Sequence, residues 1–372
     1  MGMRLLIVHL VVIKNRRMIN LTQTFTYYPL GNAQTMLLEL GNKKKMLFDF
    51  ADVKSSELED KRWDIVNEFD DIESFDVVVF THAHEDHIKG AADFFCMEYS
   101  LKRDDGVKID ELWLSVAFVT DTNCSTEDAR VIRQEARARL KKGKGVKVFG
   151  HNKAFTKWLE NSNISEESVE HLIFHAGENI PHTMGKEVSI FLHAPFSDDC
   201  DDVDDKNDPS VVMQVRLHNP GRETNILITG DTPYDVLGEI VQITCSKNRE
   251  NYLQWDLYDV PHHCSDTGLC SSSTDYIEPT DDVKWLLEQS GTNAFMVASC
   301  KPLAETNTPP PSSEAAEVYK DFIESDVDFR ITMEFRKQSA PEPMVFIIDS
   351  RGLRLKQSAS SAHFNSPPPR AG

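Results

Sequence analysis

The sequence predicts a single layered α/β domain, in which β-sheets are packed against helices. Short apolar, β-branched runs recur along the chain, and turn residues or stretches with helical spacing separate them. The 372 residues are 40% hydrophobic, which is enough to bury a large core. Neither an internal repeat nor a break in composition marks a second domain. These observations favour one α/β unit.

The chain is strongly acidic. It has 60 Asp and Glu residues against 40 Lys and Arg residues, and its net charge at pH 7 is −20. This charge disfavours a wide surface for the phosphate backbone of a long duplex. It remains compatible with a small-molecule or single-stranded nucleic-acid substrate, because bound metal cations can reverse the sign of the local field. The sequence does not point to any protein partner.

The cysteines and the N-terminal segment indicate the cellular compartment of the protein. The seven cysteines are scattered and form no C-x-x-C pair, which favours free thiols in a reducing cytoplasm over a disulfide scaffold. The apolar stretch 5–13 is too short to span a membrane, and Lys14, Arg16 and Arg17 follow it without a cleavage site. We expect no membrane association. Residues 1–20 are predicted to be an extension that holds an extra strand or reflects an upstream start, with Met18 as an alternative start.

The first half of the expected domain alternates strands and helices. Strand-like runs lie at 24–28, 35–40, 46–50, 75–80 and 111–116. A polar stretch predicts a helix around 55–69. A second helix is predicted from Ser125, its cap, to Lys142, where Gly143 ends it, and a third over 153–160.

Strand-like runs resume in the second half, at 188–192, 211–217, 225–229, 255–260 and 294–298. The acidic segment 198–208 lacks the spacing and glycine of a calcium loop, so we interpret it as a solvated loop. Ser and Pro are frequent near the C-terminus, and 353–372 is predicted to be a disordered tail. The expected domain therefore covers 21–352.

The most informative segment directly follows the apolar run 75–80. It contains His82, His84, Asp86 and His87, so three imidazoles and a carboxylate stand at the end of one strand. Imidazole nitrogens together with carboxylate oxygens suit zinc and similar divalent metals. A loop held by a rigid sheet is a common place for such ligands.

Two later strands end in the same types of side chain. The run 226–229 leads through Gly230 to Asp231, and the run 255–260 leads to His262 and His263. In a sandwich of two sheets, such strand ends can converge on one edge, where ligand sites commonly form. The sequence therefore predicts a single metal centre built from three strand ends.

These residues resemble the metallo-β-lactamase superfamily of hydrolases. The segment 82–87 matches its H-x-H-x-D-H signature, and Asp231 resembles its bridging aspartate. Pro261 to Ser265 is similar to the P-H-H-G-S segment of a branch that includes the competence-protein (DNA uptake) hydrolase domains and the phosphorylcholine esterases. The segments 28–33 and 207–212 resemble two further motifs of that branch. The similarity spans roughly 24–325.

The resemblance implies an αββα four-layer sandwich with two zinc ions per chain, or manganese in their place. His82 and His84 would hold the first metal, Asp86, His87 and His263 the second, and Asp231 both. A hydroxide between the metals would attack the substrate, and Asp86 would also accept a proton. Three departures concern the substrate rather than the ligands: Cys264 replaces a glycine, Asn32-Ala33 replaces glycine-aspartate, and Phe50-Ala51 replaces threonine-glycine.

Three residues near the expected centre keep alternative interpretations. His193 is our candidate for the third histidine of the first metal, although His171, His175 and His182 lie nearby in the sequence and a structural role is the alternative. His262 is assigned to the substrate side of the centre rather than to a metal, and a histidine that only hydrogen-bonds to the backbone is the alternative. Cys264 is either a small buried side chain or a reactive thiol beside the ligands.

The sequence therefore predicts a binuclear zinc metallo-hydrolase. A phosphodiester is the expected substrate, because the branch that the chain resembles acts on such bonds. Hydrolysis of a carbonyl substrate, such as a lactone, thioester or lactam, is the alternative within enzymes. A non-catalytic metal-binding module is the alternative outside them.

Overall fold

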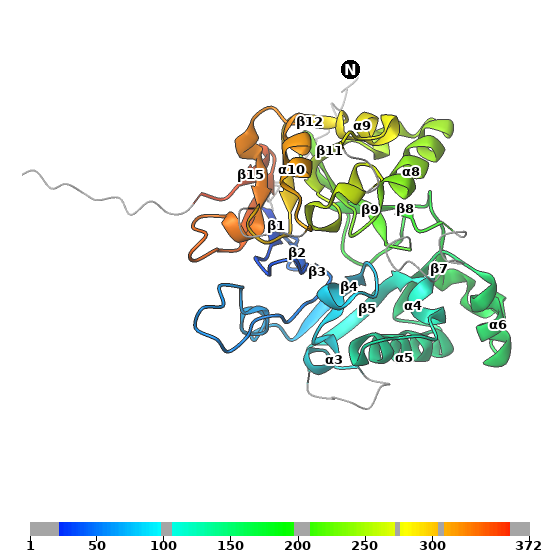
Figure 1. Cartoon of the computed structure of the whole chain (residues 1–372). Helices are drawn as coiled ribbons and strands as arrows, with labels where there is room; N and C mark the ends of the chain where they lie inside the picture. The colour runs from blue at the N-terminus through cyan, green and yellow to red at the C-terminus, as the bar shows by residue number, and fades with distance from the viewer. Residues whose placement is uncertain (1–21, 98–105, 197–208, 272–275, 304–308, 358–372) are drawn as a thin grey trace, which may run out of the picture.

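The computed structural model describes residues 22–97, 106–196, 209–271, 276–303 and 309–357. Two β-sheets lie face to face, and helices cover the outer face of each (Figure 1). This is the αββα sandwich that the sequence predicted. Residues 5–13, 198–208 and 358–372, for which an extra strand, a solvated loop and a disordered tail were expected, lie outside the described residues. No helix in the described part of the chain is both long and apolar enough to cross a bilayer.

The first sheet has nine strands in the order β15-β14-β1-β2-β3-β4-β5-β6-β7. Neighbouring strands from β3 to β7 are parallel, and the other neighbours are antiparallel. The strands of this sheet are β1 (Gln23–Tyr27), β2 (Met36–Glu39), β3 (Lys45–Phe48), β4 (Ser74–Phe80), β5 (Lys108–Ser115), β6 (Val146–Phe149), β7 (Ile173–Phe174), β14 (Met344–Asp349) and β15 (Gly352–Leu355).

The second sheet has six strands in the order β13-β12-β11-β10-β9-β8. Neighbours from β10 to β13 are parallel, whereas β8, β9 and β10 pair antiparallel. Its strands are β8 (Val188–Ala194), β9 (Val212–Asn219), β10 (Arg222–Ile228), β11 (Trp255–Asp259), β12 (Ser290–Ala298) and β13 (Phe329–Ile331). The parallel strands of each sheet end on the same side, which places their C-terminal loops together.

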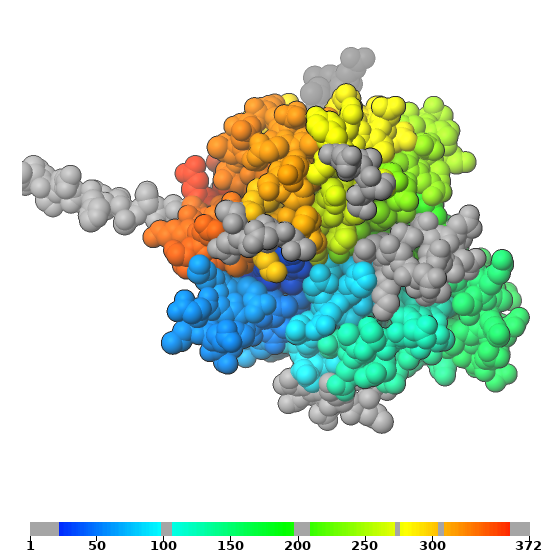
Figure 2. Space-filling view, viewed as in Figure 1, coloured from blue at the N-terminus to red at the C-terminus, as the bar shows by residue number. Residues whose placement is uncertain are grey.

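The α-helices fall into two outer layers that flank the sheets. Figure 2 shows the blue and cyan part of the chain in one half of the molecule and the yellow and orange part in the other. The helices are α1 (Ile65–Glu68), α2 (Glu85–Ile88), α3 (Ala91–Phe94), α4 (Val116–Thr120), α5 (Glu127–Lys142), α6 (Lys153–Asn161), α7 (Glu166–Val169), α8 (Tyr234–Ser246), α9 (Asp281–Leu287) and α10 (Ser313–Lys320).

Alternation along the strands separates the hydrophobic layers. In β4, Val77 and Val79 point between the two sheets, while Val78 and Phe80 point outward, where Ile132 of α5 belongs to the same cluster. All five side chains are fully buried. A third cluster lies between the second sheet and helices α8, α9 and α10. Both faces of each sheet are therefore covered, as the near-continuous apolar runs of the parallel strands require.

The structure corrects three sequence-based boundaries. The tail expected over 353–372 begins later, because 353–355 belong to strand β15 and pair with β14. The helix expected over 55–69 is reduced to α1, because the Asp60 carboxylate accepts hydrogen bonds from the backbone amides of Ser55 and Arg62 and holds the segment in turns. The cap of α5 is Thr126 rather than Ser125, since the Thr126 hydroxyl accepts from the Ala129 amide. Gly143 ends α5 as predicted, with a φ of +69°.

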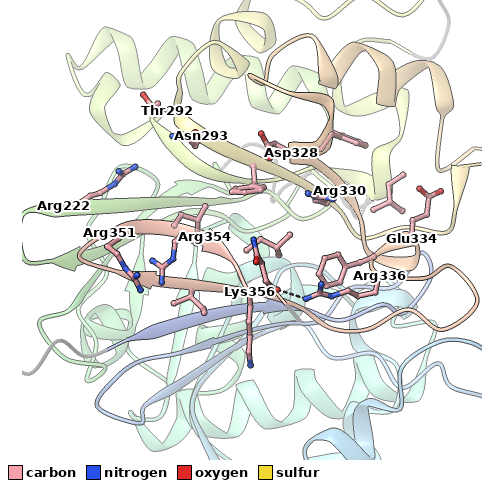
Figure 3. Close-up of a pocket in the computed structure, with 18 residues that line it drawn as sticks. Arg222, Thr292, Asn293, Asp328, Arg330, Glu334, Arg336, Arg351, Arg354 and Lys356 are labelled. Atoms are coloured by element: carbon pink, nitrogen blue, oxygen red, sulfur yellow. Dashed lines mark hydrogen bonds between the residues drawn. The ribbon is translucent and has the colours of Figure 1, made fainter. Parts of the chain in front are cut away.

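A cavity of about 1090 Å³ opens on one flank of the sandwich. It lies between β12 and β13 of the second sheet and β14 and β15 of the first (Figure 3). The turn between β14 and β15 meets the start of β10 here, since a Cβ on Gly352 would lie 2.6 Å from Nε of Arg222. No lining residue of this cavity belongs to the strand-end segments that were predicted to bind metal.

Candidate metal centre

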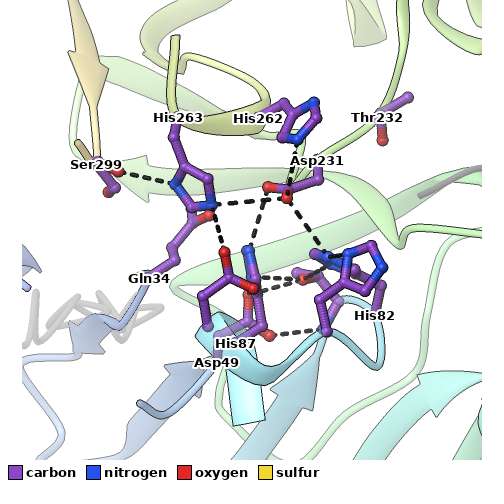
Figure 4. Close-up of polar contacts among 12 residues, drawn as sticks. Gln34, Asp49, His82, His87, Asp231, Thr232, His262, His263 and Ser299 are labelled. Atoms are coloured by element: carbon purple, nitrogen blue, oxygen red, sulfur yellow. Dashed lines mark hydrogen bonds and ion pairs between the residues drawn. The ribbon is translucent and has the colours of Figure 1, made fainter. Parts of the chain in front are cut away.

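Six of the predicted ligands meet at one edge of the sandwich, between the two sheets (Figure 4). They come from the loops after three strands, one in the first sheet and two in the second. These residues are His82, His84, Asp86 and His87 after β4, Asp231 after β10 and His263 after β11. The convergence expected from the three strand ends is therefore present in the structure.

The first group consists of His82, His84 and Asp231, whose ligand atoms all lie within 4.8 Å of one another. Nε2 of His82 is 3.1 Å from Nδ1 of His84 and 3.5 Å from Oδ2 of Asp231. His82 and Asp231 are buried, whereas His84 is partly exposed. Two imidazole nitrogens from the loop after β4 and one carboxylate oxygen from the loop after β10 thus lie close together.

The second group consists of Asp86, His87, Asp231 and His263. Oδ1 of Asp231 is 3.2 Å from Nε2 of His87, and Oδ2 of Asp231 is 3.6 Å from Nε2 of His263. Nε2 of His263 is also 3.2 Å from Oδ2 of Asp86. Asp231 belongs to both groups, so its carboxylate is the one element that joins them.

Two atoms of these groups are left without hydrogen bonds. Nε2 of His87 and Oδ1 of Asp231 are buried and have no hydrogen-bond partner, although they face each other. A buried polar atom without a partner is costly, and such atoms are unusual in folded proteins. A cation between them would satisfy both, and imidazole with carboxylate is a donor set that suits zinc or manganese. The residues present therefore fit a divalent metal.

A short helix presents the ligands that follow β4. His84 has an extended backbone at the N-terminus of α2, and this helix of four residues carries both Asp86 and His87. The backbone carbonyl of Asp86 accepts a hydrogen bond of 3.0 Å from the amide of Gln34. The loop between β1 and β2 therefore holds the helix in place beside the groups.

Asp49 orients one of the ligands, and sequence reasoning missed this role. Its carboxylate accepts hydrogen bonds of 2.7 Å each from Nδ1 of His87, the Thr81 amide and the Thr81 hydroxyl. Because a carboxylate only accepts, Nδ1 of His87 carries a proton, and Nε2 is the nitrogen that would bind a metal in the second group. The signal was available, since Asp49 directly follows β3, the strand beside β4.

The paired histidines lie on a turn with an unusual backbone. His262, His263 and Cys264 have φ values of +48°, +53° and +65°, in the left-handed region that non-glycine residues seldom adopt. Nδ1 of His263 donates to the carbonyl of Ser299 at 2.8 Å, which directs Nε2 toward Asp86 and Asp231. The turn therefore projects His263 into the second group.

His262 lies beside the two groups but belongs to neither. Its Nδ1 is 2.8 Å from the Thr267 hydroxyl, and its Nε2 is 3.9 Å from Oδ2 of Asp231. The side chain is 25% exposed, compared with 2% for the side chain of His263. His262 therefore lies at the solvent side of the two groups.

Gly230 allows the loops of the two sheets to approach closely. Its φ is +55°, and a Cβ at this position would lie 3.2 Å from Cβ of Thr81. A side chain would therefore be strained and would push the Asp231 loop away from the His82 loop. The strand-end glycine noted in the sequence thus has a steric function at this edge.

Burial and neighbouring charges shift the pKa values of several ligand side chains in the two groups. Burial alone would raise the pKa of Asp231, but the neighbouring His87, His263 and His82 hold that pKa well below its usual value. Burial alone would lower the pKa of His87, but the charges of Asp231 and Asp49 raise it well above the usual value. Burial lowers the pKa of His84 to about 4. The centre therefore keeps its carboxylates ionised, as ligands for a cation must be.

The structure does not bring His193 into either group. His193 belongs to β8, at the edge of the second sheet, and a register irregularity lies between Leu192 and Ala194. Its ring contacts Phe191 on the outer side, and its Nε2 donates to the Tyr252 carbonyl at 3.0 Å. The side chain therefore faces helix α8 instead of the metal edge. The alternative candidates His171, His175 and His182 are also outside both groups.

We expect His193→Ala to leave the metal content of the purified protein unchanged. The substitution removes a buried ring and its hydrogen bond, so a loss of about 2 kcal/mol in unfolding free energy is expected instead. Metal analysis and thermal unfolding of the same preparation distinguish the two effects. A loss of bound metal at unchanged stability would show that His193 reaches the first group.

Cys264 is a buried packing residue. The thiol is inaccessible, and it belongs to the cluster between the second sheet and its helices. Burial raises the pKa of the Cys264 thiol to about 12. The thiolate that metal binding or rapid oxidation needs is therefore scarce at neutral pH. The burial of the thiol and its contact with the Ser312 carbonyl, at 3.8 Å from Sγ, favour the packing role.

Comparisons with known proteins yield distant structural neighbours only. No protein-family model matches the chain, and no curated protein is significantly similar in sequence. A diphosphatase from the PhnP family has 11% identity and a TM-score of 0.35, with 88% of this chain and 98% of that chain covered. A subclass B3 metallo-β-lactamase from a soil metagenome, MEM-A1, has 10% identity and a TM-score of 0.32, with coverage of 64% and 76%. The metallo-β-lactamase GOB-18 from Elizabethkingia meningoseptica has 12% identity and a TM-score of 0.32, with coverage of 70% and 87%.

Proposed function

We propose that this chain is a metal-dependent hydrolase with a binuclear centre, most specifically a phosphodiesterase. The observation that carries the proposal is the shared position of Asp231, which joins one group with His82 and His84 to another with Asp86, His87 and His263. The orphaned Nε2 of His87 and Oδ1 of Asp231 support it. Zinc, or manganese, is the metal that these nitrogen and oxygen donors favour.

The chain's own residues take distinct parts in this reaction. When bound, divalent ions acidify water and stabilise negative charge on a substrate oxygen. Asp86 is the most exposed of the carboxylates, with 41% of its side chain accessible, so it can take up a proton from the solvent side. His262, beside Asp231 and partly exposed, is placed to contact the substrate. Asp49 and Ser299 orient His87 and His263.

The phosphodiester part of the proposal rests on sequence resemblance. The segments Pro261–Ser265 and 207–212 resemble a branch that acts on phosphodiesters, while the metal groups by themselves suit carbonyl substrates as well. The net charge of −20 favours a small or single-stranded substrate over a long duplex. We infer a small-molecule or single-stranded nucleic-acid substrate and a cytoplasmic location.

The test is a substrate panel after metal analysis. We expect about two equivalents of zinc or manganese per chain, and hydrolysis of bis-nitrophenyl phosphate, nitrophenyl phosphorylcholine or single-stranded DNA. Asp86→Ala, with the fold retained by circular dichroism, should lose this activity. The panel also contains a lactone and a thioester. Hydrolysis of these two substrates alone would assign a carbonyl substrate instead. A protein that binds no metal would favour a non-catalytic module and overturn the proposal.

A further inference from the structure

The cavity on the flank of the sandwich is cationic in a chain that is otherwise strongly acidic. Two acidic side chains, Asp328 and Glu334, line it together with six basic ones. The basic residues are Arg222, Arg330, Arg336, Arg351, Arg354 and Lys356. They come from β10, β13, β15 and adjoining turns, so the fold collects them from distant parts of the sequence (Figure 3). A concentration of positive charge of this kind attracts anions.

Carboxylates neutralise these cations only in part. Arg351 and Arg354 share the carboxylate of Asp349, at 3.1 and 2.9 Å. The carboxylate of Asp256 is 3.8 Å from Arg222, beyond hydrogen-bond distance. Arg330 and Lys356 have no ion pair among the described residues, and Nε of Arg330 is buried without a hydrogen-bond partner. Several guanidinium donors therefore remain available to a ligand.

Among the described residues, Asp328 and Glu334 are the only acidic side chains that line this cavity. Residues 1–21 and 358–372 contain no Asp or Glu. Strands β8 and β9, between which the acidic segment 198–208 stands in the sequence, lie on the opposite side of the second sheet from β13. Charge complementarity therefore points to a separate molecule as the occupant.

Apolar and aromatic side chains form part of the lining, which narrows the class of ligand. Phe295 is partly exposed in the cavity, and the guanidinium of Arg336 lies over the ring of Phe335, 4.7 Å from its centroid. An aromatic ring beside arginines suits a ligand that combines a flat base with phosphate groups. The volume of about 1090 Å³ exceeds what inorganic phosphate needs.

We propose that this cavity is a nucleotide-binding site, distinct from the metal centre, that takes nucleotide phosphates on Arg330 and Lys356 and a base against Phe295. The ligand is a free nucleoside polyphosphate or nucleotides within a single strand, which offer the same chemistry. The site does not depend on hydrolysis, and its ligand needs no bound metal.

The experiment is equilibrium binding to the full chain after removal of metal, so that failure of the hydrolase proposal does not affect it. Fluorescein-labelled oligo-dT is followed by anisotropy, and unlabelled ATP, pyrophosphate and polyglutamate serve as competitors. We expect Arg330→Gln combined with Lys356→Gln to weaken binding about tenfold or more and to lower the salt dependence by about two phosphate contacts. Arg130→Gln combined with Lys141→Gln, on exposed positions of α5, is the matched control and should have no effect.

A second variant tests the base. Phe295→Leu keeps an apolar side chain but removes the ring. It should therefore weaken the binding of ATP or oligo-dT about tenfold and leave the binding of pyrophosphate unchanged. If ATP binds as tightly as oligo-dT, the ligand is a free nucleotide. If oligo-dT binds much more tightly than ATP, the ligand is a nucleic-acid single strand. Either result supports the site. Absence of binding at low salt, equal losses in the control pair, or equal competition by polyglutamate would overturn the proposal.

Discussion

Asp231→Ala is expected to lower the metal content of the protein and to reduce kcat/KM by about 10³-fold or more. The Asp231 carboxylate belongs to both ligand groups, so the substitution removes one ligand from each. Bound metals contribute several kcal/mol to the stabilisation of developing charge, and 1.4 kcal/mol corresponds to about a factor of ten in rate. Metal analysis and initial rates on the best substrate of the panel measure the two effects.

The control for this substitution lies four residues along the chain. Asp235 is exposed in the first turn of α8, so Asp235→Ala should retain metal and activity. Circular dichroism should show that the fold of Asp231→Ala persists, because the buried apolar clusters do not depend on this residue. Turnover of Asp231→Ala at the rate of the unmodified protein would disprove the binuclear proposal.

Asp49→Asn is expected to weaken metal binding at the second group by about 10- to 100-fold. The Asp49 carboxylate accepts from three donors, including Nδ1 of His87. An amide can accept on its oxygen only, and its NH₂ group would donate to Nδ1 of His87. The proton of the imidazole would then move to Nε2, the nitrogen that faces Asp231 and must be free to bind a metal.

The measurement for Asp49→Asn is competition with a metal chelator at several concentrations. The equivalent held by the second group should change more strongly, because Asp49 contacts Nδ1 of His87 directly. Its link to His82 of the first group runs only through the Thr81 hydroxyl. The matched control is Asp76→Asn, which alters a carboxylate that pairs with Lys44 at 2.7 Å away from the groups. Equal loss of both equivalents, or no loss, would show that Asp49 does not act by orienting His87.

Sequence reasoning located most of the candidate site because the relevant signals are local. The segment 82–87, Asp231 and His263 each stand directly after an apolar strand, and the parallel strands end on one side. Asp49 obeys the same rule after β3 but has no neighbouring histidine in the sequence. Its role becomes visible only when β3 and β4 pair and the carboxylate meets Thr81 and His87.

His193 illustrates the opposite case. It also follows an apolar run, and the sequence could not distinguish it from the other strand-end histidines. Side chains alternate between the two faces of a strand, so a shift of one residue changes the face that a side chain occupies. In β8, Leu192 points between the sheets, so His193 lies on the outward face with Phe191 and packs against Phe191 and Tyr252.

The sequence by itself determined the layered fold and the strand ends that carry side chains able to bind a metal. Hydrophobic alternation and short motifs depend only on residues that are close together in the sequence. Only the tertiary structure decided which histidines face the centre, that Asp49 orients His87, and that cations from β10, β13 and β15 surround one cavity. These features depend on strand register and on contacts between residues far apart in the chain. No pattern within a single segment encodes such contacts.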